Sequence, residues 1–154
     1  MSFHERLGVA KEFEKSVMDR VSQSAGWICF TFGQANLPEN ARSRLMLSHS
    51  LIRWMPDLIA AHDGGKLILL DAKCCRTDTQ NWDIEISSIY ALTMHVQFYE
   101  IPGYFVFPDF SVMTPRTARM KSMNGLTTDN GSGTPYVLVP KSASNKTLDD
   151  ILII

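Results

Sequence analysis

The strongest constraint on the fold of this chain is a pair of apolar runs, residues 54–61 and 66–73, separated by His62-Asp63-Gly64-Gly65. Asp and Gly at such a junction are the residues that a tight turn with positive φ angles requires. The two runs are therefore predicted to pair as an antiparallel β-hairpin.

The length of the turn decides which side chains face each other across this hairpin. With a three-residue loop, residues 63–65, His62 faces Lys66. The same register then places Asp57 directly opposite Asp71, on one face of the sheet, with their Cβ atoms about 5 Å apart. A two-residue loop would shift the pairing by one position and separate the two carboxylates.

The remaining patterns predict a mixed α/β fold in which helices pack on a central sheet. The further elements expected, in chain order, are a helix at residues 5–25 ended by Gly26, a strand at 27–32, a long connection at 33–53 with a short helix near 39–48, a helix at 84–100, a strand at 104–107, a mobile basic loop at 114–134 and a strand at 136–139. No linker divides the 154 residues, so a single domain is expected, with an α-β-β-β-α-β core.

Charge and cysteine content limit the classes of function. Fifteen Lys and Arg against sixteen Asp and Glu give a net charge of -1, so the chain as a whole is not a basic nucleic-acid binder. A polyanionic partner would have to bind through a local feature of the surface and not through the overall charge. The three cysteines form no CxxC pair and no disulfide framework, which favours a reducing cytoplasm. The apolar runs are far shorter than the ~18 residues of a membrane span, so a membrane location is not expected.

Three carboxylates interrupt apolar patterns, which is informative because an isolated buried carboxylate costs several kcal/mol. Glu14 falls within the apolar arc of the first predicted helix, although a carboxylate at the edge of that arc could also reach solvent. Asp57 and Asp71 repel each other in the predicted register unless a cation lies between them. The three carboxylates, with the backbone carbonyl of Ala72, would offer the hard oxygen ligands that Mg²⁺ or Mn²⁺ prefers.

Pro56-Asp57 and Asp71-Ala72-Lys73, preceded by a helical Glu14 and the strand entry Gly26-Trp27, resemble the motifs of the PD-(D/E)XK nuclease superfamily, and specifically its Holliday junction resolvase-like members. The resemblance covers residues 5–107 and implies a restriction-endonuclease-like core, with residues 108–154 as a C-terminal elaboration.

The resemblance implies Mg²⁺-dependent hydrolysis of DNA phosphodiester bonds, with Mn²⁺ as a substitute. It assigns Glu14, Asp57, Asp71 and the carbonyl of Ala72 to the metal, and Lys73 to the attacking water. Without the two aspartates, Lys73 would be interpreted as a solvated lysine at a strand end.

Other polar residues are candidates for accessory roles. Gln97, on the helix expected at residues 84–100, is a possible accessory residue of the site, because related nucleases sometimes place a glutamine there. Basic residues in the predicted loops are candidates for contacts with DNA phosphates, with ordinary solvated charge as the alternative: Arg42, Arg44, Arg53, Arg76, Arg116, Arg119 and Lys121. A bound divalent cation would change the formal charge from -1 to +1.

The leading hypothesis is a small Holliday junction resolvase that acts in DNA recombination or repair. A nuclease core with few additions leaves little protein surface for contacts with DNA bases. Recognition of the shape of branched DNA requires less protein surface. Two symmetric incisions would require a homodimer. The alternatives are a restriction-type or phage-encoded duplex endonuclease, located in the host cytoplasm, and a catalytically silent DNA-binding or assembly protein with a nuclease fold.

Overall fold

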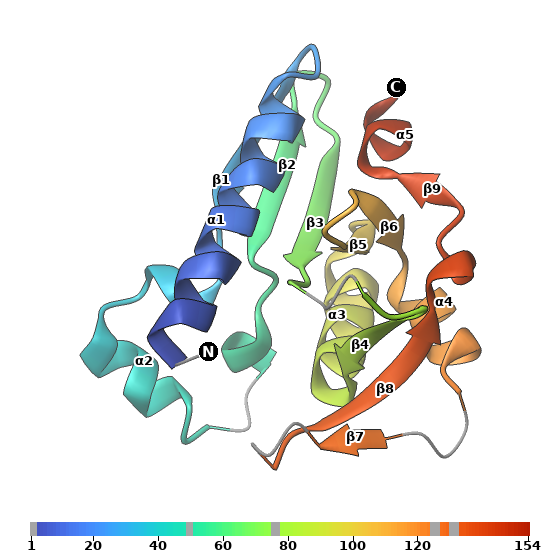
Figure 1. The fold of residues 1–154 in the computed structure, drawn as a ribbon. Helices are drawn as coiled ribbons and strands as arrows, with labels where there is room; N and C mark the ends of the chain where they lie inside the picture. The colour runs from blue at the N-terminus through green and yellow to red at the C-terminus, as the bar shows by residue number, and fades with distance from the viewer. Residues whose placement is uncertain (1–2, 49–50, 75–77, 124–126, 130–132) are drawn as a thin grey trace.

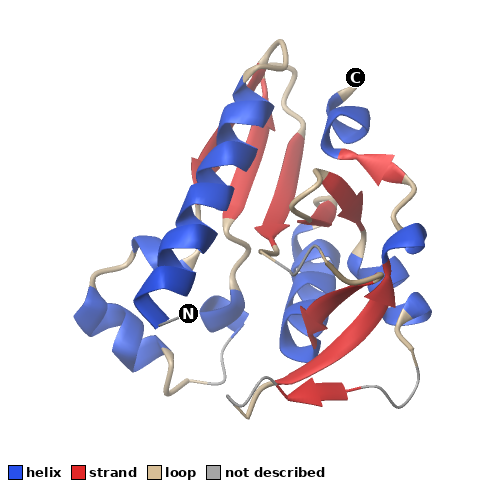
Figure 2. Cartoon of the chain, in the orientation of Figure 1, coloured by secondary structure: helices blue, strands red, loops and turns tan. Residues whose placement is uncertain are grey.

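The computed structural model describes residues 3–48, 51–74, 78–123, 127–129 and 133–154, which form helices around two β-sheets (Figures 1 and 2). The elements are, in chain order, α1 (Phe3–Ser22), β1 (Trp27–Thr31), η1 (Gln34–Asn36), α2 (Glu39–Leu45), η2 (Leu51–Trp54), β2 (Leu58–His62), β3 (Leu67–Ala72), β4 (Asn81–Glu85), α3 (Ile86–Tyr99), β5 (Gly103–Val106), β6 (Ser111–Met113), α4 (Pro115–Lys121), β7 (Thr127–Asp129), β8 (Pro135–Pro140), η3 (Lys141–Ala143), β9 (Lys146–Thr147) and α5 (Leu148–Leu152).

The main sheet has the strand order β1-β2-β3-β5-β6-β9, and the second sheet has the order β4-β8-β7. All neighbouring strands are antiparallel except β3 and β5, which are parallel and are therefore joined by a crossover that contains β4 and α3. The predicted α-β-β-β-α-β core is confirmed, with β4 as an addition between the third strand and the second helix.

The β2–β3 hairpin has the predicted three-residue loop. The His62 N–H donates to the Lys66 carbonyl over 2.9 Å, and Gly65 has a φ of 84°, which an L side chain rarely adopts. Leu58 pairs with Leu70, and one step further in this register Asp57 lies opposite Asp71. The expected pairing of the two aspartates is therefore confirmed at the level of the backbone.

Two clusters of buried side chains lie on opposite faces of the main sheet, because successive residues of a strand point to opposite faces. Leu70 packs with Val17 and Val21 of α1, whereas Leu69 packs with Phe105 and Leu92 on the α3 face. Each buried side chain of this size contributes about 1.5–3 kcal/mol relative to an exposed one. The packing fixes β3 from both sides, so the residues at its C-terminal end are held on a rigid strand.

Two sequence-based expectations are wrong. The helix expected at residues 84–100 begins only at Ile86, because residues 84 and 85 complete β4, whose pairing with β8 decides their conformation. The loop expected at residues 114–134 contains α4, which begins with Pro at its first position and is capped by the Thr114 hydroxyl, the acceptor of the Thr117 N–H.

The C-terminal segment docks on α1 and on the main sheet. Leu148, Ile151 and Leu152 of α5 are buried in the same cluster as the apolar face of α1. The indole N–H of Trp27 donates to the carbonyl of Leu152 over 2.9 Å, and Arg20 forms an ion pair with Asp149. Residues 148–152 therefore complete the core, whereas Ile153 and Ile154 remain exposed.

Candidate active site

The carboxylates singled out from the sequence converge at the end of the β2–β3 hairpin that is opposite its turn. Asp57 directly precedes β2, Asp71 lies near the end of β3 with 9% of its surface exposed, and Glu14 lies on α1. Asp57 lies close enough to Asp71 and Glu14 for the charges of both to raise its pKa, beyond the larger effect of its burial. Residues far apart in the sequence are thus brought together where three elements meet.

Asp57 is held in a position where its negative charge is unfavourable. Burial raises its pKa well above the ordinary value, and the neighbouring charges of Asp71 and Glu14 raise it further. Lys73 opposes this shift, as does the backbone N–H of Ala72, which donates to Asp57 Oδ2 over 2.9 Å. The Asp57 carboxyl is therefore held in one orientation, but the surrounding protein does not fully compensate its negative charge.

The backbone of Asp57 is anchored to the end of β1. Its carbonyl accepts hydrogen bonds from the N–H groups of Phe32 (2.7 Å) and Gly33 (3.1 Å). A Cβ atom at Gly33 would lie only 3.1 Å from the Asp57 Cα and 3.4 Å from Asp57 Oδ1. The absence of a side chain at position 33 therefore leaves room for Asp57 beside its anchor.

Glu14 is half-buried on the side of α1 that faces the sheet, whereas Glu12 is exposed. Burial raises the pKa of Glu14, Asp71 raises it further, and Lys11 lowers it. Glu14 is therefore the better buried of these two glutamates, in agreement with its position in the apolar arc of the helix.

Lys73 lies beside Asp71, one of the three carboxylates Asp57, Asp71 and Glu14 that are here called the acidic cluster. Its Nζ is 2.9 Å from Asp71 Oδ1 and lies 5.6 Å from the centre of the Phe105 ring. Burial on its own would lower the pKa of Lys73, but Asp71, Asp57 and Glu85 outweigh that effect and raise it above its ordinary value. Lys73 is therefore a charged donor in this arrangement.

A chain of hydrogen bonds extends from Lys73 to the second sheet. Lys73 Nζ donates to Ser88 Oγ (3.0 Å), Ser88 Oγ donates to Glu85 Oε2 (3.2 Å), and Tyr136 Oη donates to Glu85 Oε1 (3.1 Å). Sequence reasoning missed Glu85, Ser88 and Tyr136. The only sequence signal for them is the spacing of Glu85 and Ser88 by three residues at the start of a helix, and Tyr136 joins them only through the β4–β8 pairing.

The donor set has the chemistry of a site for a hard divalent cation. It consists of carboxylate oxygens; burial and, to a smaller extent, the charges of neighbouring carboxylates raise the pKa values of Asp57 and Glu14, and a cation would relieve the repulsion between these charges. As the side chains of the described residues stand, they form no group of three or more His, Cys, Asp or Glu close enough to hold a metal ion. The ammonium of Lys73 instead pairs with Asp71.

The structure does not bring Gln97 to this cluster. It is exposed on α3, nine residues beyond Ser88, which corresponds to roughly 14 Å along a helix axis. Ser88, near the start of α3, is the residue of that helix that reaches Lys73.

The predicted DNA-binding residues divide into two groups, one on α2 and η2 and the other on α4; α2 lies at the left of Figure 1 and α4 at the right. Arg42 and Arg44 lie on α2, and Arg53, on η2, stacks its guanidinium 4.7 Å from the centre of the Trp54 ring. The exposed residues Arg116, Arg119 and Lys121 lie on α4, which packs on α3, β5 and β8. Arg76 lies outside the described residues.

A pocket of about 230 Å³ adjoins Glu14, between α1 and the segment that follows β1. It is lined by Lys11, Glu14, Lys15, Met18, Thr31 and Asn36. Lys11 and Lys15 add positive charge beside the acidic cluster, and sequence reasoning did not single them out. Their positions one helical turn apart place both on the Glu14 side of α1.

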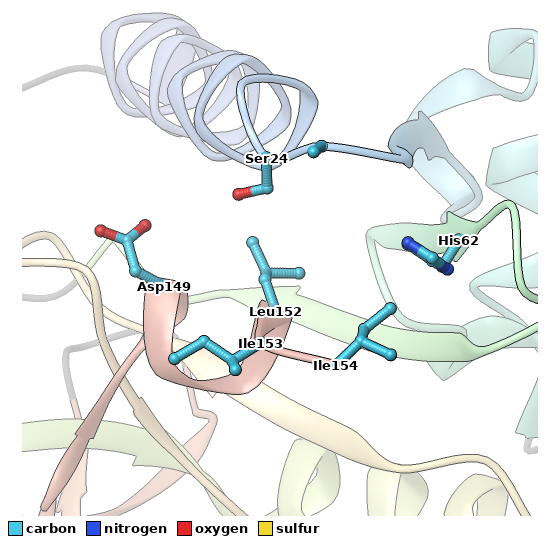
Figure 3. Close-up of a pocket in the computed structure, with 7 residues that line it drawn as sticks. Ser24, His62, Asp149, Leu152, Ile153 and Ile154 are labelled. Atoms are coloured by element: carbon cyan, nitrogen blue, oxygen red, sulfur yellow. The ribbon is translucent and has the colours of Figure 1, made fainter.

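A second pocket, of about 310 Å³, lies at the other end of the hairpin, between α5 and the end of α1 (Figure 3). Its lining includes Ser24, His62 and Asp149. These three residue types occur in nucleophilic triads, but Figure 3 shows His62 and Asp149 on opposite sides of Leu152, and Asp149 is paired with Arg20. This pocket is therefore not assembled for nucleophilic catalysis.

Among the described residues, no helix combines the length and the hydropathy needed to cross a membrane.

Comparison with known proteins identifies the fold. No protein-family model matches the sequence, and no curated protein matches it. Among solved structures, Hjc, a Holliday junction resolvase from the archaeal hyperthermophile Archaeoglobus fulgidus, matches with a TM-score of 0.59 and 10% sequence identity, over 93% of this chain and 99% of that chain. The chain thus shares the restriction-endonuclease-like fold of this resolvase, which is the fold class that the sequence predicts.

Proposed function

We propose that this protein is a metal-dependent DNA endonuclease that cuts branched DNA, most specifically a Holliday junction resolvase. The observation that carries the proposal is the convergence of Asp57, Asp71 and Glu14 at one end of the hairpin, with Lys73 beside Asp71. The likeness of the fold to the archaeal resolvase supports four-way junctions as the substrate.

Asp57, Asp71 and Glu14, with the carbonyl of Ala72, would hold Mg²⁺, for which Mn²⁺ would substitute. Bound Mg²⁺ would supply Lewis-acid stabilisation of the negative charge that develops on the scissile phosphate. Asp57 is oriented for this role by the Ala72 N–H. Lys73 would contribute a fixed positive charge and an N–H donor that orients the attacking water.

The DNA backbone would be held by basic side chains around the carboxylates rather than by a net positive charge of the chain. Lys11 and Lys15 line the pocket beside Glu14, so they support a path for the phosphates along α1. Arg42, Arg44 and Arg53 would extend that path from α2 and η2. The residues of α4 would have to contact a more distant part of a branched substrate.

Homodimerisation, which two symmetric incisions require, is supported by an exposed apolar surface on β1. Ile28 and Phe30 of β1, and Phe32 directly after it, lie at alternate positions, with 60%, 43% and 41% of their surfaces exposed. Aromatic side chains exposed side by side are typical of protein–protein contacts. We therefore propose that this face, here called the β1 face, pairs with a second copy of the chain.

The decisive experiment is a cleavage assay on four-way junctions, flaps, single strands and linear duplexes, with Mg²⁺, Mn²⁺ or EDTA. We expect metal-dependent, symmetric cuts near the branch point of the junction. Asp71→Asn should lower the cleavage rate at least about 100-fold, because it removes a charged oxygen ligand. Asp63→Asn, the same change at the exposed turn of the hairpin, should leave the rate unchanged.

The other outcomes identify the alternatives. Cleavage of linear duplex DNA at a fixed nucleotide sequence would indicate a restriction-type or phage-encoded endonuclease. Binding of junctions without cleavage, together with no heat of Mn²⁺ binding in calorimetry, would indicate a DNA-binding or assembly protein. Cleavage by Asp71→Asn at the wild-type rate would refute the proposed site.

A further inference from the structure

The hydrogen-bond chain that ends on Lys73 has a fixed direction. The Glu85 carboxylate has no proton to donate, and the Lys73 ammonium has no lone pair to accept. The hydroxyl proton of Ser88 must therefore point toward Glu85, and its oxygen lone pairs must point toward Lys73. Glu85 thus determines that Ser88 acts as an acceptor for Lys73.

Glu85 occupies a position that helix capping does not explain. It is the N-cap residue of α3, where Ser, Thr, Asp or Asn is preferred, and its side chain makes no capping hydrogen bond. Both carboxylate oxygens are instead used by hydroxyl groups, one from Ser88 and one from Tyr136. The half-buried Glu85 side chain is therefore held by two hydroxyl groups rather than by the end of the helix, which points to a role beyond forming the helix.

The hydrogen-bond chain leaves the Lys73 ammonium with one N–H donor that is free to contact a substrate. An ammonium group has three N–H donors, and here one is directed at Asp71 Oδ1 (2.9 Å) and another at Ser88 Oγ (3.0 Å). With two donors fixed by groups on different elements, the direction of the third is fixed as well. A phosphate oxygen or the attacking water is the partner that this third donor would contact during the proposed cleavage.

We propose that Glu85 is a positioning residue that aims the Lys73 ammonium by orienting the hydroxyl of Ser88, with Tyr136 holding Glu85 in place. This inference rests on the proposed nuclease function. It assigns a role to the second sheet, because β4 and β8 contribute Glu85 and Tyr136 and so tie that sheet to the end of β3.

Kinetics of single and double variants test the proposal. Glu85→Ala and Ser88→Ala should each lower kcat about 10–100-fold, as loss of a supporting partner typically does, with little change in KM. The double variant should lose no more than either single variant, because Glu85 acts only through Ser88. Glu85→Gln should recover most of the rate, since an amide oxygen still accepts from Ser88 and the amide N–H donates to Tyr136. Glu12→Ala, on the exposed side of α1, is the control and should have the wild-type kcat.

A readout that does not depend on cleavage separates this proposal from the proposed function. In ¹H–¹⁵N spectra of the lysine ammonium groups, the Lys73 signal, assigned by its absence in Lys73→Met, should be sharp in the wild-type protein and lost through solvent exchange in Glu85→Ala and Ser88→Ala. Thermal unfolding identifies any variant that fails to fold.

Three results would overturn the proposal: a wild-type kcat in Glu85→Ala, additive losses in the double variant, or an unchanged Lys73 signal. A wild-type protein that cuts no DNA would refute the nuclease function and, with it, any catalytic role of the hydrogen-bond chain. The ammonium spectra would still show whether Glu85 positions Lys73.

Discussion

Asp57 Oδ2 accepts a 2.9 Å hydrogen bond from the backbone N–H of Ala72, the residue that follows Asp71 on β3. This bond fixes the Asp57 carboxyl beside the like charge of Asp71, so the protein orients a group whose ionisation it disfavours. The folded state therefore carries a local energetic cost at the candidate site.

Asp57→Asn should stabilise the protein at pH 8, by on the order of 1 kcal/mol or a few degrees in Tm, because it keeps an acceptor for Ala72 and removes the charge. The folded-state pKa of Asp57 is raised, so ionisation favours the unfolded state, and the penalty grows as pH rises from the unfolded pKa through the folded one. The gain should therefore shrink toward pH 4. Urea unfolding at both pH values tests this, with Asp63→Asn as the control. Equal or lower stability of Asp57→Asn at pH 8 would contradict it.

Gly33→Ala should impair the candidate site more than the fold. Gly33 has a φ of -68°, so the backbone tolerates Ala, but the new Cβ would press on the Asp57 backbone at 3.1 Å. We expect a loss of about 1–2 kcal/mol of stability and a loss of about 100-fold in the rate of metal-dependent cleavage, which is the larger effect in free energy. The matched control is Gly8→Ala within α1, where nothing lies within 4 Å of the new Cβ, and which should stabilise the protein by up to about 1 kcal/mol. Wild-type cleavage by Gly33→Ala would exclude the steric argument.

Cys29 should resist alkylation in the folded protein. Burial raises the pKa of its thiol to about 11, so at pH 8 only roughly one molecule in a thousand carries the reactive thiolate. Mass spectrometry after iodoacetamide treatment should show Cys29 reacting at least about 100-fold more slowly than in the unfolded chain. Exposed Cys74 provides the internal comparison. Rapid labelling of Cys29 under native conditions would contradict the packing of β1 against α1.

Phe30→Asp should convert a dimer into a monomer if a second copy covers the β1 face. Burying a new carboxylate in an apolar interface is costly, whereas in a monomer the side chain is already 43% exposed. Light scattering coupled to gel filtration should report half the wild-type mass, with Tm changed by no more than a few degrees. Met120→Asp, at a residue of α4 that is 69% exposed, should remain a dimer. A monomeric wild-type protein would remove the β1 face from the proposal.

The hairpin and its carboxylates could be predicted because their signals are local. The turn at residues 63–65 fixes the register, and the register alone brings Asp57 to Asp71. Glu14 could be predicted because the helical period of α1 places it on the apolar side.

The second sheet could not be predicted, because its signals are not local. β4 and β8 are separated by about 50 residues, and neither alternates clearly enough to reveal the partner strand. Residues 84 and 85 fit the helical pattern that follows them, and only pairing with β8 makes them part of a strand. The contact of Ser88 with Lys73 depends on that pairing, which is why the supporting groups of the site were missed while its carboxylates were found.

The docking of α5 on α1 has a consequence for biosynthesis. Val17 and Val21 are covered by residues 148–152, so the apolar side of α1 stays incompletely buried until more than 120 further residues have left the ribosome. At about 5–20 residues per second, that interval lasts several seconds or longer, a period in which chaperones can bind the nascent helix.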